Sequence, residues 1–176
     1  NGWYYIARAN EIVGEKGFYY EQCGRQLAVY RGGDGKVYCV DAFCLHMGAN
    51  LGMGGTTVNE SCIQCPFHGF LFDGRTGLCV YPNGKPKLLT KCEYPSGVKH
   101  QTKNSEGLAL IKTEEKLAKL KVYPIREMNQ NIYVWIHSRD ELPHYEPLKC
   151  TGDFQSRGVS TIYTNTHIID VKENAI

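Results

Sequence analysis

The most informative part of this 176-residue sequence reads Cys44-Leu45-His46-Met47-Gly48 and, farther on, Cys65-Pro66-Phe67-His68-Gly69. Each stretch offers one thiolate and one imidazole, at the spacings C-x-H and C-x₂-H, and eighteen residues lie between them from His46 to Cys65. Two sulfur and two nitrogen ligands on two loops suit either one tetrahedral zinc ion or two irons bridged by sulfide. The sequence therefore predicts a metal centre at Cys44, His46, Cys65 and His68.

An interpretation without metal fits each of these residues alone but not the four together. A single cysteine is usually a small buried hydrophobe, and a single histidine usually forms ordinary hydrogen bonds. Here a glycine, Gly48 or Gly69, closely follows each ligand pair. We expect these glycines to let the backbone approach and to direct N–H groups at the metal-bound sulfurs. Zinc is the less favoured alternative: Cys62 forms a C-x₂-C pair with Cys65, but Cys62 is predicted to lie in the strand leading to the ligand loop.

Short runs rich in aromatic and β-branched residues flank the two loops and predict strands. The predicted strands cover residues 3–7, 26–30, 36–40, 120–126, 132–137 and 161–169. Gly32–Gly35 and residues 129–131 have the composition of hairpin turns. The one helical pattern, residues 114–120, is short, and residues 95–106 have the composition of an exposed loop. Many short strands with hardly any helix indicate an all-β fold, an antiparallel sandwich or barrel.

Composition and charge exclude several classes of function. The chain is 42% hydrophobic and 22% charged with a formal net charge of +2, too small a surplus to predict a nucleic-acid or anionic-membrane partner. No apolar stretch is long enough to span a bilayer and no signal peptide is evident. The eight cysteines are spread along the chain rather than packed as in a disulfide-stapled mini-protein, so we expect a reducing compartment.

The stretches 44–52 and 65–70 resemble the Rieske domain of Rieske non-haem iron oxygenases. They are most similar to those of the Neverland-type sterol (cholesterol) 7-desaturases and the related 3-ketosteroid hydroxylases. Residues 72–79, 123–127 and 132–135 resemble further motifs of the same families. The likeness covers residues 2–140 apart from a divergent loop at about 85–115. It implies a Rieske-type antiparallel β-sandwich or barrel whose two loops hold a [2Fe–2S] cluster.

The resemblance also implies a role for each ligand. Cys44 and Cys65 would hold the iron that stays ferric, and His46 and His68 the iron that takes up the electron. The outer nitrogens of the two imidazoles would couple proton uptake to reduction. Because neutral imidazoles place less negative charge on the cluster than thiolates do, the reduction potential lies above that of an all-cysteine cluster.

Three positions separate this chain from the Rieske proteins of respiratory complexes. Those proteins brace their loops with a disulfide, and here the two equivalent positions hold Ala49 and Phe67. They also place a hydrogen-bonding serine where this chain has Phe70, a position that is usually Trp in the oxygenases. Fewer hydrogen bonds to sulfur stabilise the reduced cluster less, so we expect a potential near the low end of the Rieske range, about −150 mV.

The predicted organisation is a Rieske domain over residues 1–150, followed at 151–176 by the start of an oxygenase catalytic domain or by a C-terminal extension. In the family, D-x-x-H-x₃₋₅-H then binds a mononuclear Fe(II), but this sequence ends before such a motif. The remaining histidines do not have that spacing, so we predict no catalytic residue in the chain as given.

Two functions follow from the resemblance. The first is one-electron transfer in the N-terminal part of a sterol oxygenase, reduced by a reductase or ferredoxin and assembled as a homotrimer. Its membrane anchor, in the endoplasmic reticulum, would lie outside this chain. The alternative is a non-enzymatic Rieske-like electron carrier, or an accessory subunit of a larger assembly, without the mononuclear iron. Whether the natural reading frame continues past Ile176 into D-x-x-H-x₃₋₅-H separates the two.

Overall fold

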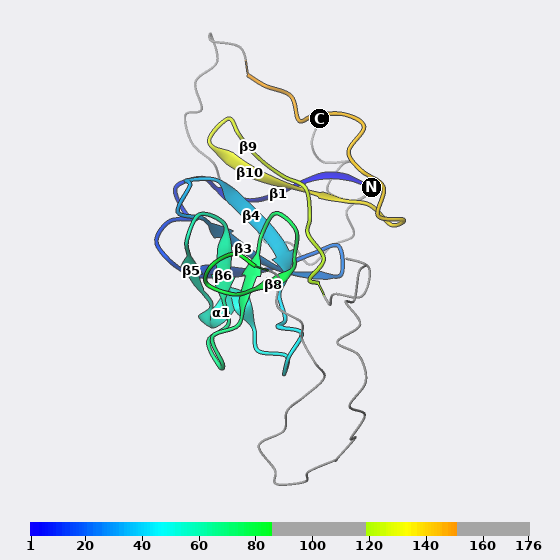
Figure 1. The fold of residues 1–176 in the computed structure, drawn as a ribbon. Helices are drawn as coiled ribbons and strands as arrows, with labels where there is room; N and C mark the ends of the chain where they lie inside the picture. The colour runs from blue at the N-terminus through cyan, green and yellow to red at the C-terminus, as the bar shows by residue number, and fades with distance from the viewer. Residues whose placement is uncertain (86–118, 151–176) are drawn as a thin grey trace, which may run out of the picture.

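The computed structural model describes residues 1–85 and 119–150, which form three small antiparallel sheets (Figure 1). The sheet orders are β1-β10-β9, β2-β3-β4 and β5-β6-β7-β8. The elements are β1 Gly2–Arg8, β2 Gly17–Gln22, β3 Arg25–Arg31, β4 Val37–Asp41, α1 Leu51–Gly54, β5 Thr56–Val58, β6 Cys62–Gln64, β7 Leu71–Asp73, β8 Cys79–Val80, β9 Ile125–Met128 and β10 Asn131–Ile136. The all-β class and the antiparallel arrangement predicted from the sequence are confirmed.

The sheet β2-β3-β4 lies between the other two sheets and contributes to both cores. Successive side chains of a strand point to opposite faces. In β3, Leu27 and Val29 therefore pack in a core with residues of β1 and β10, such as Ile132. Ala28 and Tyr30 pack in a second core with residues of β6 and β7. This second core also contains the two cysteines predicted to bind metal, so side chains of the central sheet share a core with the predicted metal site.

The strands predicted at 3–7, 26–30, 36–40 and 132–137 are confirmed as β1, β3, β4 and β10. The second hairpin turns at Asn129 and Gln130, which have φ angles of 53° and 63°. The strand predicted over 120–126 is wrong in its first half, because β9 begins only at Ile125. Before it the chain makes isolated bridges from Lys119 and Val122 to other segments. Pro124, which has no N–H to donate, precedes the start of β9.

Three sequence predictions fall wholly or mainly outside the described residues: the strand at 161–169, the loop at 95–106 and the helical pattern at 114–120. The two described residues of that pattern, Lys119 and Leu120, are not helical. The structure instead has the single turn α1, which the sequence analysis missed. In the part of the chain that the structure describes, no helix is long and apolar enough to cross a membrane.

Candidate metal centre

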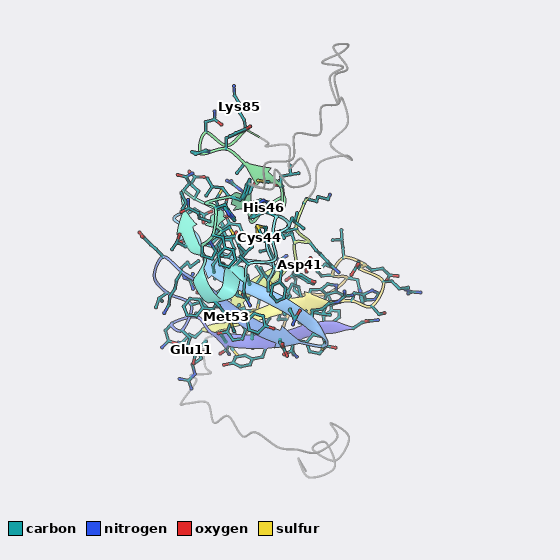
Figure 2. All side chains as sticks on the ribbon, turned by 90° about the horizontal axis from the view of Figure 1, so that it is seen from below. Glu11, Asp41, Cys44, His46, Met53 and Lys85 are labelled. Atoms are coloured by element: carbon teal, nitrogen blue, oxygen red, sulfur yellow. The ribbon has the colours of Figure 1, made fainter. Side chains whose placement is uncertain are left out.

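The two predicted ligand loops connect elements that pack around one core. Residues 42–50 join β4 to α1, and residues 65–70 join β6 to β7 (Figure 1). Cys44 and Cys65, at the first position of each loop, are both buried in the core that contains Phe72 and Leu120. In Figure 2, Cys44 and His46 lie close together on the first loop. The fold thus brings together two segments that are distant in the sequence.

Both loops have the same backbone hydrogen bonds although their ligand spacings differ. In the first, the N–H of Cys44 donates to the carbonyl of Ala49 over 2.9 Å and the N–H of Gly48 donates back to the carbonyl of Cys44 over 2.9 Å. In the second, Cys65 donates to Phe70 over 2.8 Å and Gly69 donates back to Cys65 over 3.1 Å. One loop geometry is therefore built twice, with the cysteine at its base and the histidine at its tip.

The two glycines are required by conformation. Gly48 and Gly69 have φ angles of 72° and 68°, in the left-handed region that favours glycine. A Cβ on Gly48 would meet nothing within 4 Å, so crowding does not select glycine there. The N–H groups of the two glycines themselves close their own loops. The N–H groups of His46 and Met47 are hydrogen-bonded to the sulfur of Cys44.

The two thiols lie within hydrogen-bonding reach of each other. Burial and, to a lesser extent, the neighbouring Cys65 raise the pKa of the Cys44 thiol to about 11, although the N–H groups of His46 and Met47 act in the opposite direction. A buried pair of thiols loses its protons readily only when a metal cation binds the sulfurs, because the cation stabilises the thiolate form. The N–H groups at Cys44 already stabilise that form.

The two imidazoles form a second pair. The ring of His46 lies 4.8 Å from the ring of His68 and 4.8 Å from that of Phe70, measured between centroids. The Nδ1 atom of His46 is buried and has no hydrogen-bond partner among the described residues. Leaving a buried polar atom unpaired costs about 1–3 kcal/mol, so this nitrogen lacks one interaction that a bond to metal would supply. His68, in contrast, is exposed.

The pairing of like ligands distinguishes two kinds of metal centre. Within residues 1–85 and 119–150, no group of three or more His, Cys, Asp and Glu side chains is placed to hold one metal ion. A tetrahedral zinc site needs four ligands around one ion, whereas a mixed Cys₂His₂ iron–sulfur cluster takes two protein ligands for each iron. One pair of thiols beside one pair of imidazoles therefore fits the two-iron centre better than zinc. Cys62 lies in β6, as predicted, and belongs to a separate small core with Leu71 and Val80.

Comparison with known proteins agrees with this geometry. The sequence profile of the Rieske [2Fe–2S] domain matches residues 2–124. The chain belongs to the Rieske [2Fe–2S] domain family. The cofactor of this Rieske domain is a [2Fe–2S] cluster, and its function is electron transfer in the manner of Rieske oxygenases. The profile ends before β9 and β10, which complete the sheet with β1.

Several curated relatives of this Rieske domain are cholesterol 7-desaturases. The chain is 33% identical to cholesterol 7-desaturase nvd 1 of Ciona intestinalis over 99% of its own length and 32% of the relative's. It is 36% identical to cholesterol 7-desaturase nvd of Xenopus laevis, over 86% of its length and 28% of the relative's. The chain therefore spans only about a third of these relatives.

Solved oxygenases have the same fold. Apo dicamba monooxygenase superposes with a TM-score of 0.51 at 28% identity, over 76% of this chain and 32% of that one. The terminal oxygenase of carbazole 1,9a-dioxygenase from Nocardioides aromaticivorans IC177 superposes with a TM-score of 0.57 at 21% identity, over 82% of this chain and 32% of that one.

The described cysteines outside the two loops differ in their exposure. The seven described cysteines form no disulfide with one another. Of those without a predicted ligand role, Cys39, Cys62 and Cys79 are buried, whereas Cys23 and Cys150 are exposed. Cys92 lies outside the described residues.

Proposed function

We propose that Cys44, His46, Cys65 and His68 hold the [2Fe–2S] cluster. The observation that carries this proposal is the repeated loop, which presents a buried pair of thiols beside a pair of imidazoles. The unpartnered Nδ1 of His46 supports ligation through that atom, which would leave Nε2 as its outer nitrogen. When bound, the cluster supplies a site that accepts and releases one electron at a time.

The chain's own residues set the surroundings of this site. Burial of Cys44 and Cys65 excludes water from the sulfur side, and the N–H groups of His46 and Met47 stabilise the thiolate of Cys44. Phe70 covers one side of His46, while His68 is exposed. Of the two imidazoles, His68 therefore offers the better route for the electron to leave. Its outer nitrogen is also the one that solvent can supply with a proton.

We propose a low reduction potential, near the lower end of the Rieske range at about −150 mV. Phe70 supports this value, because a phenyl ring has no hydroxyl to donate to a sulfur. Such a potential suits reduction by a flavin- or iron–sulfur-dependent donor rather than oxidation of a quinol. We therefore infer that a reductase or ferredoxin reduces this protein. Solved relatives of the same fold include oxygenase–ferredoxin complexes of carbazole 1,9a-dioxygenase.

We propose that the parent protein is a Rieske oxygenase that acts on a sterol, as a 7-desaturase does. The relatives named cholesterol 7-desaturase support this, at 29–36% identity over most of the chain. The mononuclear iron and the substrate pocket would belong to a part beyond Ile176. The parent would assemble as a trimer, and the electron would pass from the Rieske domain of one subunit to the mononuclear iron of its neighbour. Incubating the full-length parent with cholesterol, a reducing system and O₂ would give the 7,8-unsaturated sterol. A full-length parent without D-x-x-H-x₃₋₅-H would instead favour an electron carrier or accessory subunit.

The ligand assignment is tested by comparing Cys65→Ala with Cys62→Ala. Both residues are buried cysteines only three positions apart, so the second variant is a control for loss of a thiol. Iron and sulfide analysis, visible spectra and EPR of the dithionite-reduced protein should show no cluster in Cys65→Ala and a normal cluster in Cys62→Ala. His68→Cys should retain a cluster of lower potential. A zinc-loaded, colourless wild-type protein would refute the assignment.

A further inference from the structure

The single-turn helix α1 is built directly onto the end of the first ligand loop. Asn50 is the last residue of that loop, and its backbone forms an isolated bridge with Phe43 near the start of the loop. The Oδ1 atom of Asn50 accepts hydrogen bonds from the N–H groups of Gly52 and Met53, over 2.9 and 3.1 Å. Asn50 therefore closes the first loop with its backbone and caps α1 with its side chain.

Close backbone contacts fix α1 on strand β2. The N–H of Gly17 donates to the carbonyl of Gly55 over 2.9 Å. A Cβ on Gly52 would lie 2.7 Å from the Cα of Tyr19, and a Cβ on Gly17 would collide with the carbonyl oxygen of Leu51. Because backbone packs on backbone here without side chains between, α1 has little freedom to shift relative to β2.

The end of α1 lies against the second ligand loop. A Cβ on Gly54, the last residue of α1, would lie 3.3 Å from the ring of Pro66, which directly follows Cys65. The pyrrolidine ring restricts the φ angle of Pro66, and the N–H of Gly69 closes the loop on the carbonyl of Cys65 over 3.1 Å. The loop is therefore stiff, and a displacement at Pro66 is passed on to His68, two residues farther along the chain.

We propose that Asn50 and Gly54 are positioning residues for His68. Asn50 fixes α1, and the bare surface of α1 at Gly54 seats the second loop, so the first loop sets where the second one stands. His68 depends on such support because its side chain is exposed, and its ring lies 4.8 Å from that of His46 on the other loop. Residues that orient a metal ligand tune the centre without touching the metal. This inference deepens the proposed function and rests on the ligand role of His68.

The test is EPR of the dithionite-reduced protein, because each geometry of a histidine ligand gives its own g values. Asn50→Ala removes the cap, so His68 should occupy several positions and the EPR lines should broaden. Asn50→Asp, an equally good cap, should restore narrow lines. Gly54→Ala keeps the cap but adds a methyl group against Pro66, so its lines should stay narrow and shift in g. Met53→Ala is the control, because Met53 is 73% exposed and meets Asn50 only through its backbone N–H; its spectrum should equal that of the wild type.

Hydrogen exchange separates this inference from the proposed function. In Asn50→Ala the backbone amides of residues 67–69 should exchange about fivefold faster, as expected for the loss of a cap, with the amides of β3 unchanged. A wild-type protein without the EPR signal would refute the ligand assignment, whereas the exchange rates test the contact through α1 by themselves. If Asn50→Ala binds too little cluster for EPR, Gly54→Ala and the exchange rates decide.

A purely structural role for Asn50 has a different outcome. Asn50→Ala would then lose thermal stability but keep narrow, unshifted EPR lines and wild-type exchange at residues 67–69, which would overturn the inference. A Gly54→Ala spectrum identical to that of the wild type would overturn the role of Gly54.

Discussion

Gly48 and Gly69 show how single residues hold the metal site in shape. Alanine at either position would force a Cβ into the left-handed region, at a cost of roughly 1–2 kcal/mol. We therefore expect Gly48→Ala and Gly69→Ala to lower both the thermal stability and the iron content of the purified protein. Gly14→Ala is the control, because Gly14 has a φ of 83° with no atom within 4 Å of the added Cβ. It should lose stability but keep its iron; equal iron loss in all three variants would contradict this account.

Phe70 gives a second prediction at the scale of one residue. Its ring lies 4.8 Å from that of His46, and it occupies the position of the serine in respiratory Rieske proteins. A hydroxyl there would stabilise the reduced cluster. A bond to a charged group is worth about 1.5 kcal/mol, which equals roughly 60 mV for a one-electron couple. Phe70→Ser should raise the midpoint potential by that order relative to Phe70→Ala, which loses the same ring without gaining a donor. Equal potentials in the two variants would rule out the hydrogen bond.

The candidate ligands were predictable because metal binding requires particular side chains at short, fixed spacings. Cys44 with His46 and Cys65 with His68 stand out from one sequence for that reason. The donors to the Cys44 sulfur were not predictable, because every residue carries a backbone N–H and only the loop's dihedral angles decide where it points. The glycines predict that the backbone approaches sulfur, but the particular donors, His46 and Met47, follow only from the structure.

At the scale of elements, a polar cluster around the buried Ser61 lies at the end of the β6–β7 hairpin opposite the second loop. Ser61 is buried; its hydroxyl donates to a carboxylate oxygen of Asp73 over 2.7 Å and accepts from Arg75 over 2.9 Å. The hydroxyl of Thr76 donates to the other carboxylate oxygen of Asp73. Asp73→Asn should destabilise the protein by about 1–2 kcal/mol at neutral pH, because these bonds favour the charged carboxylate. Urea unfolding measures the change.

The same carboxylate predicts how stability depends on pH. Burial alone would raise the pKa of Asp73, but hydrogen bonds from Ser61, Arg75 and Thr76 outweigh it and lower the pKa below its usual range. A lowered folded-state pKa means that the stabilisation is present above the unfolded-state pKa of about 3.9 and is lost as the pH falls through the folded-state value. Asp73→Asn should therefore lose less stability than the wild type between neutral and acidic pH. Glu60→Gln, which removes only a 3.8 Å surface ion pair with Arg75, should retain the wild-type dependence.

Elements that depend on local pattern were predictable, and those that depend on tertiary contact were not. The β3–β4 hairpin follows from its apolar runs and glycine-rich turn. The helix α1 is a single turn in a glycine-rich segment that has low helix propensity. It forms because Asn50 caps it and because Gly52 allows it to approach β2, where a Cβ would lie 2.7 Å from the Cα of Tyr19. Neither contact can be inferred from the spacing of apolar residues.

At the scale of the whole molecule, the irregular segment 141–150 lies along the sheet β1-β10-β9. Hydrogen bonds with residues of this sheet and its turn hold the segment against the domain. The indole N–H of Trp135 donates to the carbonyl of Glu141, and that of Trp3 to the carbonyl of Tyr145, each over 2.7 Å. At its far end, Asn129 hydrogen-bonds to the backbone of Leu148 and Cys150. We propose that the Rieske domain extends through residue 150, as predicted, because the segment packs on the same sheet as β1.

The ion pair between Arg126 and Glu146 allows this fastening to be tested. The guanidinium of Arg126 binds both carboxylate oxygens of Glu146, over 2.8 and 2.9 Å, in the two-point geometry that makes such pairs strong. Because both side chains are about half exposed and solvent screens the pair, Glu146→Arg should change global stability little. Its larger effect should be local: faster hydrogen exchange at the backbone amides of residues 145–150, with the amides of β3 unchanged. The double variant Arg126→Glu/Glu146→Arg restores the opposite charges and should recover most of the protection. Exchange in Glu146→Arg that stays as slow as in the wild type would show that Trp3, Trp135 and Asn129, rather than the ion pair, hold the segment in place.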